Sequence, residues 1–212
     1  MPLKPGKRQI KSEKNKKKIY DTAMALFEKY GYEAVGVEDI VKAAGISVGT
    51  FYHYYKNKDE LIIVFLERNL QKSYDEYEET VLIPMKEEGR SAADRLFEFI
   101  HFSQGLPHEG GQEFLRVAYT YMLREPTGQL AYNFVLDPNR SYARICKELL
   151  IEGQENGEFR PEIDPEFFIK FITPLVNGID FLFCIGNRTT DIRSEYKEIF
   201  RQMVDSLRCE KA

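Results

Sequence analysis

The segment from Gly45 to Lys58 constrains the fold more than any other part of the chain, because it joins a turn to a short amphipathic helix. Gly45 stands where the residue after a helix commonly adopts a left-handed conformation, and Ser47 can cap the helix that follows. The spacing i, i+3, i+7 predicts a buried face formed by Val48, Phe51 and Tyr55. The residues left to point outward are Gly49, Thr50, His53 and Tyr54.

Two further helices are expected before this segment. The first has a predicted apolar face of Ile19, Ala23, Leu26, Phe27 and Tyr30 and ends at Gly31. The second follows the helical spacing with Val37, Ile40, Val41 and Ala44. Two helices joined by a short glycine-containing turn form a helix-turn-helix, whose second helix can enter the major groove of DNA. Small residues at its start would let the backbone approach base edges closely.

Residues 16–62 resemble the DNA-binding domain of the tetracycline-repressor (TetR) family. The resemblance rests on a helix, Gly-Tyr-Glu-Ala, a short helix and then AAGISVGTFYHYYKNKDEL, in which Asn57 and Glu60 can form a capping box for a fourth helix. It implies an all-α homodimer with a small N-terminal DNA-binding domain and a larger C-terminal domain that binds an inducer and forms the dimer.

The family's DNA contacts can be carried over position by position. Its phosphate-contacting tyrosine falls on Tyr52, and its lysine at the start of the fourth helix falls on Lys58. The base-facing positions fall on Val48, Gly49, Thr50, His53 and Tyr54. We expect Lys56 to join Tyr52 and Lys58 on phosphates, with Thr50, His53 and Tyr54 reading bases.

The second helix departs from the family pattern at two positions. Gly36 stands where a serine or threonine usually caps this helix, and Glu38 stands where a basic residue is frequent. The resemblance therefore carries no DNA contact from this helix.

The distribution of charge supports a DNA-binding N-terminus independently of the family. Residues 1–18 hold eight basic groups against Glu13, a net charge of +7, whereas the whole chain has a net charge of −4. A basic arm beside a helix-turn-helix can follow the phosphate backbone or a minor groove. A solubilising disordered tail is the alternative interpretation.

Length and punctuation predict a basic flexible arm over 1–15, a helix-turn-helix domain over 16–58 and a helical ligand-binding and dimerisation domain over 59–212. Asp137-Pro138 and Asp164-Pro165 each offer a cap followed by a proline at the first helical position, so helices should begin there. No uninterrupted apolar run reaches the roughly 18 residues of a membrane span, so we expect no membrane contact and a cytoplasmic protein. Cys146, Cys184 and Cys209 show no disulfide or metal spacing, and we expect no cofactor.

The last two helices, about 165–185 and 191–208, are where the family forms its dimer. The first of them carries more apolar residues than one intramolecular contact needs, which predicts a homodimer interface over about 165–208. The alternative is a central helix that is buried entirely within its own subunit.

Two features of the C-terminal domain are candidate ligand contacts. Thr173, Asn177 and Asp180 recur with Cys184 at helical spacing as one polar stripe on an apolar helix, beside Pro174. Such a stripe either meets water and backbone groups or lines a mostly apolar cavity. His101 and Arg116 lie among aromatic residues that are mainly core, and they are the second pair of candidates.

Three classes of function remain. The leading hypothesis is a dimeric transcriptional repressor that binds a palindromic operator in double-stranded DNA and is released by a small-molecule inducer. The alternative is a non-enzymatic chromosome-binding or architectural protein of the same fold. An all-α enzyme is disfavoured because the sequence has no phosphate loop, no HExxH and no nucleophile motif, so we expect neither catalytic residues nor a metal site.

Overall fold

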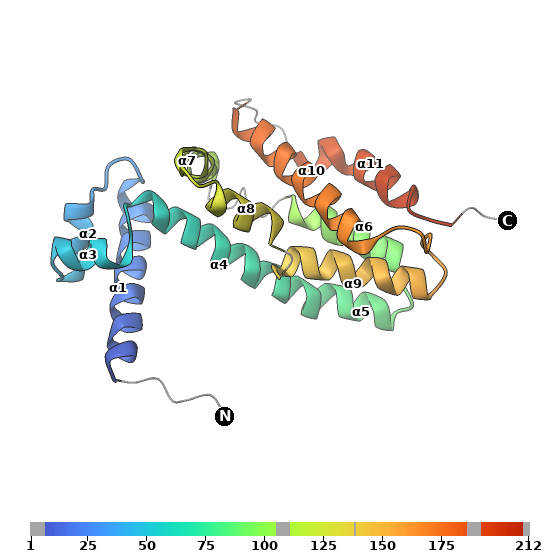
Figure 1. Cartoon of the computed structure of the whole chain (residues 1–212), viewed down its shortest axis with the longest axis horizontal. Helices are drawn as coiled ribbons and strands as arrows, with labels where there is room; N and C mark the ends of the chain where they lie inside the picture. The colour runs from blue at the N-terminus through green and yellow to red at the C-terminus, as the bar shows by residue number, and fades with distance from the viewer. Residues whose placement is uncertain (1–6, 105–110, 138, 186–191, 210–212) are drawn as a thin grey trace. The chain divides into compact units, whose positions relative to one another are not determined.

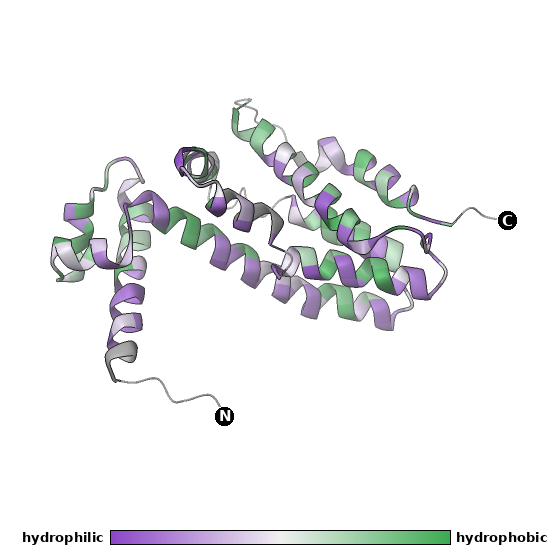
Figure 2. Cartoon of the chain, viewed as in Figure 1, coloured by the Kyte–Doolittle hydropathy of each residue, from purple (hydrophilic) through white to green (hydrophobic). Residues whose placement is uncertain are grey.

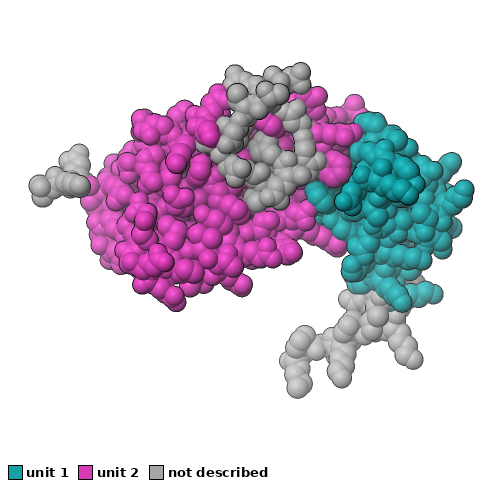
Figure 3. Space-filling model, turned by 180° about the vertical axis from the view of Figure 1, so that it is seen from behind, with its two compact units in different colours: residues 1–65 teal, residues 66–212 magenta. Residues whose placement is uncertain are grey.

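The computed structural model describes residues 7–104, 111–137, 139–185 and 192–209, and it confirms the all-α fold class over these residues. Figure 1 shows the helices in chain order, and Figure 3 colours two compact units, residues 1–65 and 66–212. The division falls between Phe65 and Leu66, inside α4, which runs from Asp59 to Tyr77.

The first unit contains α1 (Lys7–Tyr30), α2 (Val37–Ala44), α3 (Val48–Tyr54) and the start of α4. Its core is built from one face of each helix. The fully or almost fully buried apolar residues of this unit include Ile19, Ala23, Phe27, Ile40, Val41, Ala44, Phe51, Tyr55 and Leu61. The expected helix-turn-helix is therefore present, with α1 packed against α2 and α2 against α3.

Three expectations for this unit need correction. Residues 7–15 belong to α1 and are not an irregular arm, because the segment after Gly6 is rich in lysine, glutamine and glutamate, which favour helix. Tyr30 is 55% exposed, and Tyr32 takes the buried place against Phe27, with ring centroids 5.1 Å apart. Val48 is 45% exposed, because the seven-residue α3 turns only Phe51 and Tyr55 toward the core.

The second unit contains the rest of the helices. After α4 come a π-helical turn (Glu78–Leu82), α5 (Ile83–Glu87), α6 (Ala92–Ser103), α7 (Gly111–Arg124), α8 (Gln129–Leu136), α9 (Ser141–Glu155), α10 (Pro165–Ile185) and α11 (Ile192–Asp205). Phe159 and Arg208 form an isolated antiparallel bridge, which ties the α9–α10 connection to the segment after α11.

One predicted helix start is confirmed and the other is wrong. α10 begins at Pro165, and Asp164 Oδ1 accepts a hydrogen bond of 2.8 Å from the Glu166 amide. Asp137 ends α8 instead, and its carboxylate accepts from the Asn139 amide, so α9 starts only at Ser141. Pro138 lies outside the described residues.

The core of the second unit lies between α6, α9, α10 and α11, with α6 in contact with both α9 and α11. Gly153 on α9 marks the closest approach in this core. A Cβ atom at Gly153 would lie 2.2 Å from Cδ2 of Phe159, whose ring is completely buried. Only glycine therefore fits at this position without moving the ring.

The helix α10 is hydrophobic over much of its length (Figure 2). By length and composition it passes the criteria for a membrane span, with a mean hydropathy of 1.7, which the expectation from uninterrupted runs did not anticipate. One face is nonetheless packed in the core, and Asp180 is buried on it at 4% exposure. A core helix explains these properties without a membrane.

Candidate DNA-binding helix and ligand cavity

The position of α3 is set by caps that the local sequence supplies. Gly45 adopts φ +62°, and the Ile46 amide donates to the Val41 carbonyl at 3.0 Å, which ends α2. Ser47 Oγ accepts a hydrogen bond of 3.1 Å from the Thr50 amide and so caps α3, as expected. At α2, where Gly36 has no side chain to act as a cap, Asp39 Oδ2 accepts from the Gly36 amide at 2.9 Å.

The outer surface of α3 carries the predicted base-facing residues. Val48, Gly49 and His53 are exposed, and Tyr52 is 54% exposed. Thr50 is half-buried, and its hydroxyl lies 2.8 Å from that of Ser47. The half-buried ring of Tyr54 contacts the His53 ring edge to face, with centroids 4.8 Å apart, so these two side chains are positioned together.

The two lysines after α3 differ in their surroundings. Lys56 is exposed. Lys58 Nζ donates to the carbonyls of Tyr32 and Val35 at 3.0 and 3.1 Å and lies 4.1 Å from the centre of the Tyr32 ring. Two of the three ammonium protons of Lys58 therefore bind within the unit, which the sequence did not indicate. Glu60 accepts from the Lys56 amide, and its own amide donates to Asn57 Oδ1 at 3.0 Å.

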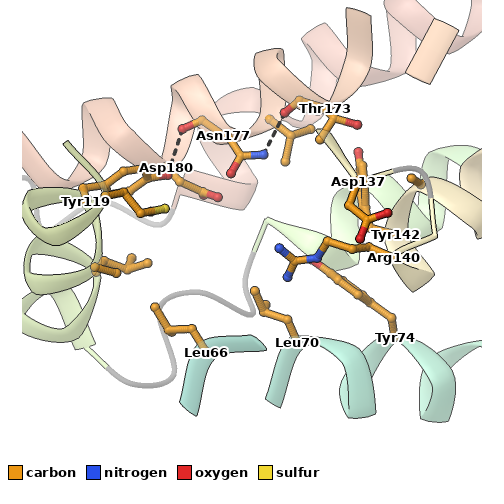
Figure 4. A pocket seen from close by; sticks show the side chains of 15 residues that line it. Leu66, Leu70, Tyr74, Tyr119, Asp137, Arg140, Tyr142, Thr173, Asn177 and Asp180 are labelled. Carbon is orange, nitrogen blue, oxygen red and sulfur yellow. Dashed lines mark hydrogen bonds between the residues drawn. The ribbon is translucent and has the colours of Figure 1, made fainter. Parts of the chain in front are cut away.

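The second unit encloses a cavity of about 50 Å³ (Figure 4). Its apolar wall comes mainly from α4 and α7. Those apolar residues are Leu66, Leu70, Leu115, Ala118 and Met122, with Val176 from α10 and Ala143 from α9. The polar lining comprises Tyr74, Tyr119, Asp137, Arg140, Tyr142, Thr173, Asn177 and Asp180.

The structure brings three of the five candidate ligand residues to this cavity. Thr173, Asn177 and Asp180 line it from α10. Asn177 Nδ2 donates to the Thr173 carbonyl at 2.8 Å, and Tyr119 donates to the Asn177 carbonyl at 3.1 Å. The polar stripe therefore faces a cavity wall that α7 also helps to form.

The other two candidates lie elsewhere. The His101 ring stacks on Phe97, with centroids 5.8 Å apart, and it is not part of the cavity lining. Arg116 Nε donates to the Cys184 carbonyl at 2.8 Å, near the end of α10. Helical spacing placed both among aromatic residues, but it could not say which helical face turns toward the cavity.

Arg140 and the buried tyrosines are the polar groups that sequence reasoning missed. Arg140 precedes α9 and lines the cavity with Asp137. Burial lowers the pKa of Arg140, and the charges of Glu67 and Asp137 oppose that effect. Burial and the charge of Asp180 both raise the pKa of Tyr74 and of Tyr119, so these phenols stay protonated at neutral pH.

The comparisons with known proteins agree with this arrangement. A sequence model for bacterial regulatory proteins of the tetR family matches residues 19–64, which include α2, α3 and their caps. The chain belongs to the TetR family. The matched region covers the helix-turn-helix, so this TetR-family protein is a DNA-binding transcription regulator.

The curated TetR-family relatives are distant. The HTH-type transcriptional repressor KstR2 of Mycobacterium tuberculosis is 26% identical over 155 residues, which cover 73% of this chain and 74% of that protein. The A-factor receptor protein of Streptomyces griseus is 22% identical over 204 residues, which cover 94% of this chain and 66% of that protein.

A solved TetR-family structure extends the likeness to the second unit. FadR of Thermus thermophilus, a repressor crystallised with lauroyl-CoA, has a TM-score of 0.69 at 18% identity, and the match covers 93% of this chain and 97% of that one. At this identity the match shows the fold alone.

Proposed function

We propose that this protein is a repressor that binds a palindromic operator as a homodimer and releases it when a small molecule fills the cavity of the second unit. The observation that carries the proposal is the Ser47-capped α3, which exposes Gly49, Tyr52 and His53 beside a unit that holds a partly polar internal cavity. A chromosome-binding role without a ligand would leave that cavity without a purpose. The protein would act in the cytoplasm, at the nucleoid when it is bound to DNA.

The division of DNA contacts follows from exposure. Tyr52 and Lys56 are exposed at the end of α3 and suit phosphate oxygens, whereas Gly49, Thr50, His53 and Tyr54 lie where base edges would pass. Lys58 keeps one ammonium proton beyond its two internal bonds, so we assign it first to holding the loop after α1.

The dimer interface that we propose is the outer face of α10 with part of α11. Large apolar side chains on this face are exposed in the single chain. They are Phe167 at 68%, Phe171 at 53%, Leu182 at 52%, Ile185 at 61% and Ile199 at 52% exposure. Burying such a patch against its twin would form a symmetric helix bundle. Two α3 helices could then reach half-sites about one turn of DNA apart.

Control by a ligand would act through α4. Leu66, Leu70 and Tyr74 line the cavity, and the same helix begins at Asp59 in the first unit. A ligand that displaces these side chains would change the position of α4 and hence the spacing of the two recognition helices. Release requires that the ligand bind the DNA-incompetent conformation more tightly, by about 5.5 kcal/mol for a shift from 1:99 to 99:1.

The test begins with an operator selected from random duplexes by the purified protein and a small-molecule screen for thermal stabilisation. Operator affinity is then measured with each stabilising compound. In Ala118→Met, the added side chain fills the cavity at a buried lining residue, and release should be lost while operator binding is kept. Thr120→Met, at an exposed position of the same helix, is the matched control and should respond like the wild type. An Ala118→Met variant that still released DNA would contradict control through this cavity.

A further inference from the structure

Acidic side chains outnumber basic ones around the proposed ligand cavity. An open groove of about 790 Å³ shares Asp137 and Arg140 with the cavity. Counted together, cavity and groove are lined by six acidic residues, Glu67, Asp75, Glu76, Glu79, Asp137 and Asp180, against three basic ones, Arg68, Lys72 and Arg140. Residues 1–65 contain 12 basic and 8 acidic residues, so residues 66–212 carry −8 of the chain's net charge of −4. The surroundings of the cavity are therefore negative both locally and over the whole unit.

The one guanidinium of the cavity wall does not balance the acids. Arg140 interacts electrostatically with Glu67 and with Asp137, so its charge is shared between two carboxylates before Asp180 is considered. Asp180 is 4% exposed on the α10 wall, close enough to the phenols of Tyr74, Tyr119 and Tyr142 to disfavour their ionisation. A buried carboxylate in such surroundings favours a positive charge or a hydrogen-bond donor nearby.

Two buried hydroxyl groups of the lining point to the same kind of ligand. Thr173 and Tyr142 are 6% and 7% exposed, and within the described residues Thr173 Oγ1 and the Tyr142 hydroxyl have no hydrogen-bond partner by distance and angle. The thiol of Cys146 is the polar group nearest to the Tyr142 hydroxyl. Buried polar groups are normally satisfied, so these oxygens are suited to accept hydrogen bonds from a ligand.

We propose that the ligand is a small amphipathic amine, whose ammonium group binds at Asp180 and the neighbouring hydroxyls and whose apolar part contacts Leu66, Leu70 and Leu115. This inference rests on the proposed function, because it assigns a chemical class to the ligand of the same cavity. A carboxylate or a polyphosphorylated thioester would bring negative charge into negative surroundings. The volume of about 50 Å³, against roughly 300–1,000 Å³ for drug-sized sites, further favours a small molecule.

The experiment uses four probes with the same eight-carbon chain: octylamine, octanol, octanoate and octanoyl-CoA. Their dissociation constants for the full-length protein are measured by calorimetry at neutral pH and two salt concentrations, and operator affinity is measured at saturation with each. We expect octylamine to bind at least tenfold more tightly than octanoate or octanoyl-CoA, a difference of about 1.4 kcal/mol, and to weaken operator binding. Higher salt should reduce this preference only modestly, because a buried ion pair is poorly screened.

Variants identify the group responsible. Asp180→Asn keeps the shape of the side chain and should remove the preference for octylamine over octanol. Glu155→Gln, which removes a charge from an exposed position of α9 outside the cavity lining, should retain it. A preference that persists in Asp180→Asn would overturn the assignment of the ammonium to Asp180.

The outcomes separate this inference from the proposed function. If octanoate or octanoyl-CoA binds more tightly than octylamine and releases DNA, the amine is wrong and ligand-controlled repression stands. If octylamine binds in the cavity and operator affinity does not change, the ligand class stands and the proposed function fails. If none of the four probes binds, the amphipathic amine is rejected.

Discussion

Lys58 offers the sharpest test of how the DNA-binding unit is built. Its ammonium donates to the carbonyls of Tyr32 and Val35, and it lies over the Tyr32 ring. Hydrogen bonds to a charged group contribute about 1.5–3 kcal/mol each when they are well buried, and a cation–π contact adds about 0.5–1 kcal/mol. Lys58 is only half-buried, so solvent screening reduces the sum, and we expect Lys58→Ala to destabilise this unit by about 2 kcal/mol.

The assay is hydrogen exchange of peptides that cover residues 31–58, followed by mass spectrometry. A loss of about 2 kcal/mol corresponds to roughly thirtyfold faster exchange where opening is local. Lys56→Ala is the matched control because Lys56 is exposed, and its exchange should match the wild type. Operator binding should respond in the opposite way. Lys56→Ala should lower the slope of log affinity against log salt by about 0.9, the value for one phosphate contact.

The two measurements together decide the role of Lys58. If Lys58→Ala left exchange over residues 31–58 unchanged and lowered the salt slope by about one, Lys58 would be a phosphate contact and the internal hydrogen bonds would be immaterial. Accelerated exchange with operator binding weakened equally on cognate and random DNA is the result that the structure predicts.

Three further substitutions test other parts of the chain. Burial raises the pKa of Glu152, but hydrogen bonds from Arg95 and Lys86 lower it further, so its folded pKa lies below the unfolded value of about 4.3; its contribution is present above that pH and is lost as the pH falls through the folded pKa. Glu152→Gln should therefore cost about 3 kcal/mol at neutral pH, by leaving buried Arg95 without its partner, and should flatten the loss of stability below about pH 4 in urea unfolding. Gly153→Ala should cost about 1–3 kcal/mol in the same assay, because its Cβ would overlap the Phe159 ring, and adding Phe159→Leu should recover part of this loss. Leu182→Glu should shift light scattering from dimer to monomer with helicity retained, and a folded dimer would contradict the proposed interface.

The features that could be predicted from sequence are those fixed by residues close together in the chain. The left-handed Gly45, the Ser47 cap and the start of α10 at Pro165 each depend on one or two neighbouring residues, and all three are confirmed. Asp137-Pro138 carries the same local signal as Asp164-Pro165, but Asp137 ends α8 and caps the following turn. Local signals therefore propose a helix end without deciding between a stop and a start.

Features that depend on packing between distant segments could not be predicted in the same way. The amphipathic pattern of α10 placed Thr173, Asn177 and Asp180 on one stripe, and that stripe does line the cavity. Nothing local indicates that Arg140 joins them, or that Lys58 turns inward to carbonyls 23 and 26 residues earlier in the chain. The π-helical turn before Pro84 likewise shows no sequence signal that we could use, although it lets the chain accommodate a residue without a backbone N–H.

The central claim is that operator binding and cavity binding are linked, and a closed thermodynamic cycle tests it most directly. The affinity for the selected operator is measured without ligand and at saturating ligand, and the affinity for the same ligand is measured without DNA and at saturating operator. Linkage requires that both affinities change by the same factor, which we expect to be between about 5-fold and 150-fold. An operator affinity that is identical with and without a ligand bound in the cavity would contradict the account.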